Sequence, residues 1–299
     1  MIEIERIGKR FQETVALREV SLSVRQGSIY GLVGSNGAGK TTLLKILAGI
    51  YKADSGALTI DSQPVFENYS IKGRTVFIPD APYHFPNFTI KDMAHFYARI
   101  YPRWNQARFE KLEEVFNIEV KRRIRTLSKG MQRQVSFWLS LTLTPDLMIL
   151  DEPLDGLDPV MRKKVKNLII QDVAERKMTV IISSHNLRDM EDICDYIGIL
   201  HQGEMLIQKD LDDLKSDVHK IQIAFSSDSP PALLQDLQVL YQEKRGSVLI
   251  LIVRGPFSEI MSRMQSYRPA VLDILPLTLE EIFIYEMGDR GYEIKNVLY

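Results

Sequence analysis

Short apolar runs alternate with helical patterns over the first two thirds of the chain. Residues 20–24 alternate between apolar and polar side chains, which predicts a strand with one buried face. Residues 28–33 and 147–150 are almost continuously apolar, which is typical of strands buried on both faces. A third such run at 179–182 is separated from the second by a helical pattern over 159–176. This order of buried strands and helices predicts an α/β fold with a mainly parallel sheet.

A helical insertion interrupts this alternation. The apolar side chains of Met93, Phe96, Tyr97 and Ile100 follow the i, i+3, i+4, i+7 spacing of one helix face. Most of them are expected to lie in the core. We predict the insertion at about residues 85–140.

The carboxy-terminal part has a different pattern. Two polar stretches, at 210–217 and 226–231, predict breaks in the fold. Further along we predict a small α+β domain with strands at 221–225 and 271–275, a hairpin turn at 244–246 and a helix at 257–266. The predicted domains are residues 1–215 and residues 216–299.

Composition excludes several classes of function. Apolar residues make up 45% and charged residues 26% of the 299 residues, which is ordinary for a folded globular protein. The formal net charge of -1 lacks the basic excess that would hold a nucleic-acid backbone. Cys194 is the single cysteine, which fits a reducing cytoplasm. No secretion signal and no apolar stretch of about 18 to 20 residues is visible, so a membrane role requires a partner chain.

A glycine-rich segment follows the predicted strand at 28–33. It matches the G-x-x-x-x-G-K-[ST] pattern of the phosphate-binding loop, and it leads into a predicted helix at 40–48 as that motif requires. Glycines let the backbone aim N–H groups at a phosphate, and the helix start adds its positive end. Lys40 is expected to reach the β and γ phosphates, and the Thr41 hydroxyl to ligate Mg²⁺. The residues expected to bind the nucleotide here are Gly34, Ser35, Asn36, Gly37, Ala38, Gly39, Lys40, Thr41 and Thr42.

A second motif makes the chain similar to a known family. Residues 127–132 read L-S-K-G-M-Q and resemble the L-S-G-G-Q signature of the ATP-binding subunits of ABC transporters, and the resemblance covers the first predicted domain. It implies a phosphate-loop ATPase with an antiparallel β subdomain, in which the signature of one subunit faces the γ phosphate held by the other. Ser128 is suited to cap the following helix, and Gly130 lets a phosphate approach the backbone. Lys129 and Met131 depart from the commoner Gly and Gln.

Two carboxylates end the apolar run at 147–150. By the resemblance, Asp151 holds Mg²⁺ and Glu152 is the general base that polarises the attacking water. An acidic pair alone is more often a solvated strand end. Asp158 resembles the ATP-site aspartate that couples the two active sites of the dimer. His185 matches the switch histidine that contacts the γ phosphate, although a lone histidine is more often structural.

Two further positions are assigned through the resemblance. Phe11 matches the aromatic residue that stacks on adenine, and the alternative is a core phenylalanine. Asp80 stands where most relatives have a glutamine, at the junction with the helical insertion. Because its carboxylate is short and charged, we expect it to contact Mg²⁺ through water.

Three features carry weaker signals. The basic run at 121–125 could hold an anion, but such a run is more often a solvated face. Exposed residues at 83–88 are candidates for contact with a membrane subunit, as this region is in the family. Residues 276–283 resemble the tail of ATPase subunits from ABC-2-type exporters, and within them Thr278 and Glu281 have the spacing of a capping box.

The predicted function is ATP hydrolysis that moves a substrate across a membrane, with export favoured and with ATP and Mg²⁺ as cofactors. The expected partners are a second ATPase subunit, identical or paralogous, and separate transmembrane permease subunits that hold the chain at the cytoplasmic face of the membrane. No nucleic acid is expected. An ABC ATPase acting on nucleic acid is one alternative, but such proteins usually carry two ATPase domains or a long coiled coil. A phosphate-loop kinase is the other, and it would not explain the signature or the switch histidine.

Overall fold

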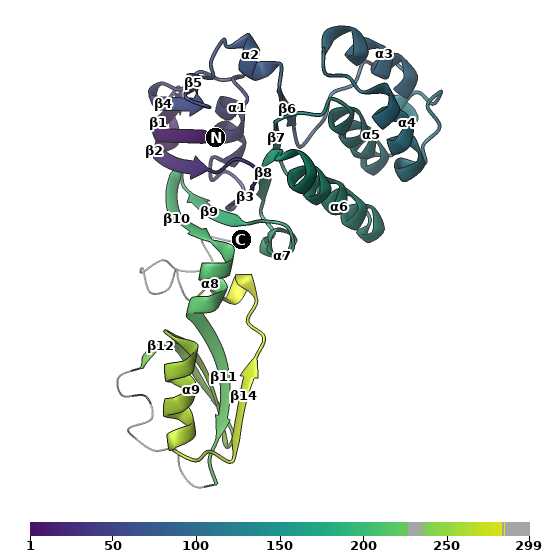
Figure 1. The fold of residues 1–299 in the computed structure, drawn as a ribbon. Coiled ribbons are helices and arrows are strands. Elements are labelled where there is room, and N and C mark those ends of the chain that lie inside the picture. The colour runs from purple at the N-terminus through teal and green to yellow at the C-terminus, as the bar shows by residue number, and fades with distance from the viewer. Residues whose placement is uncertain (227–233, 235–236, 283, 285–299) are drawn as a thin grey trace. The chain divides into compact units, whose positions relative to one another are not determined.

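The computed structural model describes residues 1–226, 234, 237–282 and 284 (Figure 1). Contacts divide the chain into two compact units, Met1–Gln208 and Lys209–Tyr299. Within the described residues, no helix has the length and apolar character needed to span a bilayer.

A six-stranded sheet forms the centre of the first unit. Its strand order is β10-β9-β3-β8-β7-β6. The strands are β3 (Ile29–Val33), β6 (Thr75–Ile78), β7 (Leu147–Leu150), β8 (Thr179–Ser184), β9 (Tyr196–His201) and β10 (Glu204–Asp210). The pairs from β9 to β6 are all parallel, which confirms the predicted parallel sheet. β3, β7 and β8 are buried along their whole lengths, as expected of parallel strands covered on both faces.

A four-stranded antiparallel sheet shares a core with the central sheet. Its strand order is β2-β1-β4-β5. These strands and the helix that follows β3 are β1 (Ile2–Phe11), β2 (Thr14–Val24), β4 (Ser55–Ile60), β5 (Gln63–Pro64) and α1 (Lys40–Leu47). Leu43, Leu44 and Leu47 of α1 lie in one buried cluster with Ile4 of β1 and Leu32 of β3. The sheet is the antiparallel β subdomain that the resemblance implies.

Helices complete the first unit. They are α2 (Tyr69–Lys72), α3 (Ile90–Ile100), α4 (Gln106–Phe116), the 3₁₀ helix η1 (Ile124–Thr126), α5 (Lys129–Thr142), α6 (Pro159–Arg176) and α7 (Leu187–Glu191). α6 has the predicted bounds. Figure 1 shows α3, α4 and α5 as a lobe beyond the β6 edge of the central sheet, which is the predicted helical insertion. The core of this helical lobe is aromatic: the fully buried Trp138 stacks on Phe109, with 4.7 Å between the ring centroids.

The second unit is an α+β fold. Its antiparallel sheet has the order β12-β13-β11-β14. Its elements are α8 (Leu211–Asp217), β11 (Val218–Ala224), β12 (Gln238–Arg245), β13 (Val248–Arg254), α9 (Phe257–Ser266) and β14 (Val271–Leu275). Ile260 and Met264 of α9 pack on Ile221, Leu251 and Val253 of the sheet. α9 and β14 have the bounds predicted from the sequence.

The polar stretch at 210–217, where the sequence predicts a break, forms helix α8 near the start of the second unit. The Asp210 side chain accepts hydrogen bonds from two N–H groups of the first turn. Leu211 and Leu214 are buried, and their i, i+3 spacing supplies the apolar contact that an acidic composition hides.

The predicted capping box near the end of the chain is confirmed. The Thr278 N–H donates to Glu281 Oε2 at 3.0 Å, and the Glu281 N–H donates to Thr278 Oγ1 at 3.2 Å. Residue Phe283, which belongs to the same predicted segment, lies outside the described residues, as do residues 227–231 of the second predicted break.

Candidate functional site

The carboxyl ends of β3, β8 and β7 meet at one edge of the central sheet. Val33 at the end of β3 pairs with Ser184 of β8, and Leu150 at the end of β7 pairs with Ile182. The segments that follow these strands therefore emerge side by side. Ligands of open parallel sheets bind at this edge.

The phosphate-binding loop connects β3 to α1 at this edge. Gly39 directly precedes α1 with φ of +106°, and a Cβ there would lie 2.6 Å from the carbonyl oxygen of Ala16, so only glycine fits. The Lys40 side chain is 6% exposed. Its Nζ donates to the carbonyl oxygens of Gly34 at 2.6 Å and Ser35 at 3.3 Å. The loop thus holds its own lysine in place by its backbone.

Thr41 and Asp151 form a hydroxyl-carboxylate pair in the same region. Thr41 Oγ1 donates to Asp151 Oδ2 at 2.7 Å, and Ser183 Oγ donates to Asp151 Oδ1 at 2.8 Å. Asp151 is 1% exposed, so both of its oxygens are satisfied inside the protein. Hydroxyl and carboxylate oxygens are the donor set that Mg²⁺ prefers, so these two residues fit that ion.

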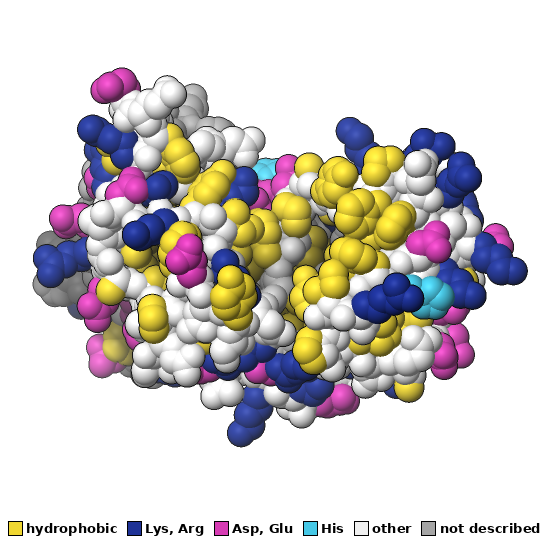
Figure 2. Space-filling model, turned by 90° about the horizontal axis from the view of Figure 1, so that it is seen from above, with side chains coloured by type: hydrophobic (Ala, Val, Ile, Leu, Met, Phe, Trp, Pro, Cys, Tyr) yellow, Lys and Arg dark blue, Asp and Glu magenta, His cyan; other side chains and the backbone are white. Residues whose placement is uncertain are grey.

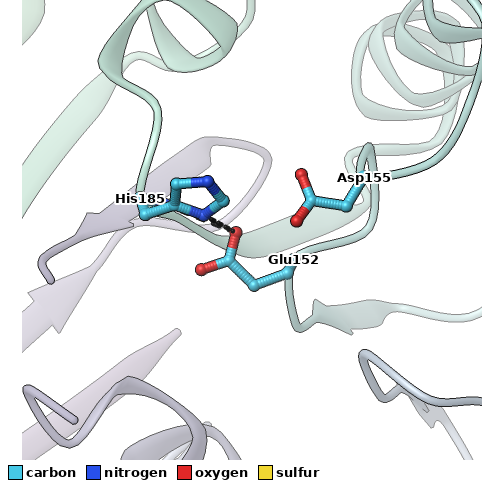
Figure 3. A group of neighbouring side chains, drawn as sticks. All are labelled: Glu152, Asp155 and His185. Carbon is cyan, nitrogen blue, oxygen red and sulfur yellow. Dashed lines mark hydrogen bonds and ion pairs between the residues drawn. The ribbon is translucent and has the colours of Figure 1, made fainter. Parts of the chain in front are cut away.

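Glu152 faces both the loop lysine and the predicted switch histidine. Its Oε1 lies 3.2 Å from Lys40 Nζ, and its Oε2 lies 3.0 Å from His185 Nδ1. Figure 3 shows Asp155 directed at the same space, and one side-chain oxygen or nitrogen of each of the three residues lies within 4.8 Å of the others. Because the Lys40 ammonium already contacts Glu152, this group is suited to proton transfer rather than to a second cation.

The predicted signature begins helix α5. Ser128 caps the helix by accepting a hydrogen bond from the Met131 N–H at 3.2 Å, as predicted. A Cβ at Gly130 would lie 2.6 Å from the carbonyl oxygen of Gly156, so the helix start packs directly on the loop after β7. Among the described residues, no hydrogen bond joins Ser128 or Gly130 to the phosphate-binding loop. Ser128 is exposed.

Phe11, Asp158 and Asp80 have distinct surroundings. Phe11 is 41% exposed and contacts Tyr51 edge-on at 5.4 Å, so it is not a core phenylalanine. Asp158 caps α6, because its Oδ1 accepts from the Met161 N–H at 3.0 Å. The Asp80 side chain, just beyond β6, is 63% exposed and its Oδ1 accepts from Arg133 at 2.9 Å.

Arg133 is the residue of this region that sequence reasoning did not find. It lies in the predicted apolar helix α5, and its side chain is 10% exposed. Its guanidinium contacts Asp80, Glu152 and Asp155. A basic residue among the apolar positions after the signature was the available signal, although arginines at helix surfaces are too common for that signal to stand alone.

Aromatic side chains gather on the helical lobe. We call Tyr83, Phe85, Phe88, Phe96 and Tyr97 the aromatic surface, because each ring packs on the next at 4.8 to 6.3 Å between centroids. Tyr83 is 74% exposed, whereas burial raises the pKa of Tyr97 to about 12. Figure 2 shows hydrophobic side chains on both sides of a hollow in the face seen from above.

Ile100 and the basic run at 121–125 both lie largely on the surface of the helical insertion. Ile100, expected in the core of the insertion, is 53% exposed at the end of α3, whose buried residues, Ile90, Met93 and Ala94, all lie in its first half. In the basic run, Ile124 is buried while the Lys and Arg side chains are exposed, as in a solvated face.

Comparisons with known proteins identify the family. A family model described as ABC transporter matches residues 17–155. The chain is 33% identical to the ABC transporter ATP-binding protein YtrB of Bacillus subtilis (strain 168) over 290 residues, which are 97% of this chain and 99% of that protein. It is also 33% identical over 218 residues to the bacitracin transport ATP-binding protein BcrA of Bacillus licheniformis, with 72% of this chain and 71% of that protein covered.

A solved structure of an ATP-binding subunit of an ABC transporter has the same architecture. It superimposes with a TM-score of 0.66 at 26% identity, over 72% of this chain and 92% of that one. The fold, the motifs and these relatives agree: the chain belongs to the ATP-binding subunits of ABC transporters and is an ATPase.

Proposed function

We propose that this chain hydrolyses Mg²⁺-bound ATP to drive export of a substrate through separate transmembrane chains. The observation that carries the proposal is the convergence of Lys40, the Thr41–Asp151 pair and the Glu152–His185 pair at one edge of the sheet. These groups supply, in order, a cation for the terminal phosphates, oxygen ligands for Mg²⁺ and a positioned base.

Each residue has one task in the reaction. The backbone N–H groups of residues 34–39 and the start of α1 cradle the phosphates, while Lys40 exchanges its contact with Glu152 for the β and γ phosphates. Thr41 and Asp151 hold Mg²⁺, which offsets the charge of the triphosphate. Freed from Lys40, Glu152 accepts a proton from the attacking water, and His185 holds that water and the γ phosphate.

The remaining site residues complete the nucleotide contacts in this proposal. The exposed ring of Phe11 stacks on adenine, and Thr42 extends the phosphate contacts from the first turn of α1. Asp158, at the amino end of α6, contacts the ATP site across the dimer. Three positions support these assignments: Thr42 lies in α1 directly after the phosphate-binding loop, Phe11 ends β1, and Asp158 caps α6.

Asp80 is proposed to sense Mg²⁺ through water. Replacing Asp80 by alanine removes the carboxylate, so we expect the Mg²⁺ concentration for half-maximal ATPase to rise several-fold. A Mg²⁺ titration of turnover at fixed ATP measures this. Asp80→Asn, which keeps the size and the hydrogen-bonding oxygen, is the matched comparison, and it should shift the titration less. An unchanged Mg²⁺ dependence in Asp80→Ala would remove Asp80 from the metal site.

The site requires a second ATPase subunit. Ser128 is exposed at the start of α5 and is not bonded to the phosphate-binding loop of its own chain within the described residues. A helix start with an exposed serine and a close glycine suits the γ phosphate of another subunit. Two copies, or one copy and a paralogue, would therefore enclose two ATP molecules.

The aromatic surface is proposed as the docking site of the membrane chain. Tyr83 and Phe85 are exposed at the end of a cluster that extends into the helical lobe, and exposed aromatic patches mark interaction sites. This contact would hold the chain at the cytoplasmic face of the membrane. Export is favoured by the resemblance of residues 276–283 to exporter tails.

Removing this surface should separate the chain from its membrane partner. We expect the double substitution Tyr83→Ala and Phe85→Ala to lower the affinity for the permease by at least about 30-fold, since truncating interface aromatics costs about 1 to 2 kcal/mol or more each, and co-purification should fall accordingly. Ile170→Ala, at an exposed apolar position of α6, is the control, and melting temperatures report folding. Undiminished co-purification of the double variant would show that the docking site lies elsewhere. Capture of RNA or DNA in place of a membrane chain would favour the nucleic-acid alternative.

A further inference from the structure

Arg133 connects the signature helix to the segments that follow β6 and β7. Its Nη1 donates to the carbonyl oxygen of Glu152 at 2.8 Å and to that of Asp155 at 2.5 Å. Its Nη2 donates to Asp80 Oδ1 at 2.9 Å and also to the Asp80 carbonyl oxygen. One side chain of α5 thus holds three points of the surrounding loops.

The chemistry of the arginine explains why one residue can do this. A guanidinium presents several N–H groups in a fixed plane, whereas a lysine ammonium is a single point charge. At 10% exposure the charge also needs a counter-ion, and the carboxylate of Asp80 lies 2.9 Å away. This pairing offsets the negative charge that an aspartate in place of glutamine brings near the triphosphate.

The contact with Glu152 bears on catalysis. Glu152 has φ of +45°, a left-handed backbone that costs free energy in any residue with a Cβ. Three hydrogen bonds restrain its backbone: its N–H donates to Ser183 Oγ at 3.0 Å, and its carbonyl oxygen accepts from Arg133 at 2.8 Å and from the Asp155 N–H at 3.4 Å. The same backbone conformation places the Glu152 carboxylate beside His185.

The other end of the network reaches the signature. α5 begins just after Ser128, and at Gly130 the helix start packs on the carbonyl oxygen of Gly156. One turn beyond Arg133, Ser136 Oγ lies 3.1 Å from His84 Nε2, which ties the segment after β6 to the helix a second time. A shift of α5 therefore moves the loops that carry Asp80, Glu152 and Asp155.

We infer that Arg133 is a positioning residue. It links the backbone of Glu152, which serves the ATP site of its own chain, to the position of Ser128, which serves the ATP site of the partner. This inference rests on the proposed function, because it assumes that Glu152 is the base and that Ser128 faces a partner's nucleotide. Arg133 contacts neither the phosphate-binding loop nor Lys40 among the described residues, so its loss acts on turnover and dimer closure rather than on the first binding of ATP.

The steady-state kinetics of ATP hydrolysis distinguish a loss of turnover from a loss of ATP binding. In the full chain, Arg133→Met should lower kcat by about tenfold or more and change KM for ATP by less than about threefold, since a misplacement of about 1 Å can cost up to a hundredfold in rate. Arg133→Lys keeps the charge without the planar fork and should recover only part of kcat. Arg122→Met, at an exposed arginine before η1, is the matched control and should turn over at the wild-type rate.

Dimer closure is the second readout. In a Glu152→Gln background, Arg133→Met should raise several-fold the ATP concentration at which half of the protein is dimeric. A kcat within twofold of wild type together with an unchanged dimer titration would overturn the inference, as would full recovery by lysine. If Arg133→Met melts well below wild type, Arg133→Lys carries the test. A wild-type chain that neither hydrolyses ATP nor dimerises would instead overturn the proposed function.

Discussion

Glu152→Gln is expected to bind ATP but to hydrolyse it at least about a hundredfold more slowly than the wild-type chain. The amide keeps the size of the side chain and an oxygen within reach of Lys40 and His185, but it cannot accept the proton of the attacking water. A positioned general base contributes about 10²- to 10⁴-fold to such reactions. Because the proposed site is complete only when a second subunit encloses the ATP, the variant should accumulate as an ATP-bound dimer.

Phosphate release and size-exclusion chromatography with ATP measure the two parts of this result. Glu114→Gln, at an exposed glutamate of α4, is the matched control and should resemble the wild type in both assays. Turnover of Glu152→Gln at the wild-type rate would exclude Glu152 as the base. Slow turnover without a dimer would keep the base and contradict the shared site.

Local pattern was sufficient to predict most of the fold. Strands such as β7 are short, apolar and flanked by helical patterns, and burial on both faces is the only arrangement that hides such a run from water. The acidic stretch now seen as α8 was missed, because its stability comes from Leu211 and Leu214 and from a side-chain cap that composition does not report. Periodicity with only two buried positions is weak evidence for a helix.

The candidate site, like the fold, has residues that local sequence motifs predict and residues that they do not. Lys40, Thr41, Asp151 and Glu152 belong to contiguous motifs, so the sequence names them, and the structure brings them together at one sheet edge. Arg133 and its acceptors are far apart in the chain, and three of its four hydrogen bonds go to backbone carbonyl oxygens, which have no sequence signature. Such a network can be recognised only in the folded structure.

Lys40→Met is expected to weaken ATP binding by about 10- to 100-fold. Methionine is apolar and of similar length, so it cannot make the charge-assisted contact with the β and γ phosphates for which Lys40 is proposed to leave Glu152. A charge-assisted hydrogen bond contributes about 1.5 to 3 kcal/mol, which corresponds to this range of affinity. Isothermal titration of ATP with Mg²⁺ measures the effect, and Lys52→Met, at an exposed lysine after α1, is the control. The same loss should appear in a Glu152→Gln background, where hydrolysis cannot obscure it; an unchanged affinity there would mean that the backbone N–H groups of the loop bind the phosphates without the lysine.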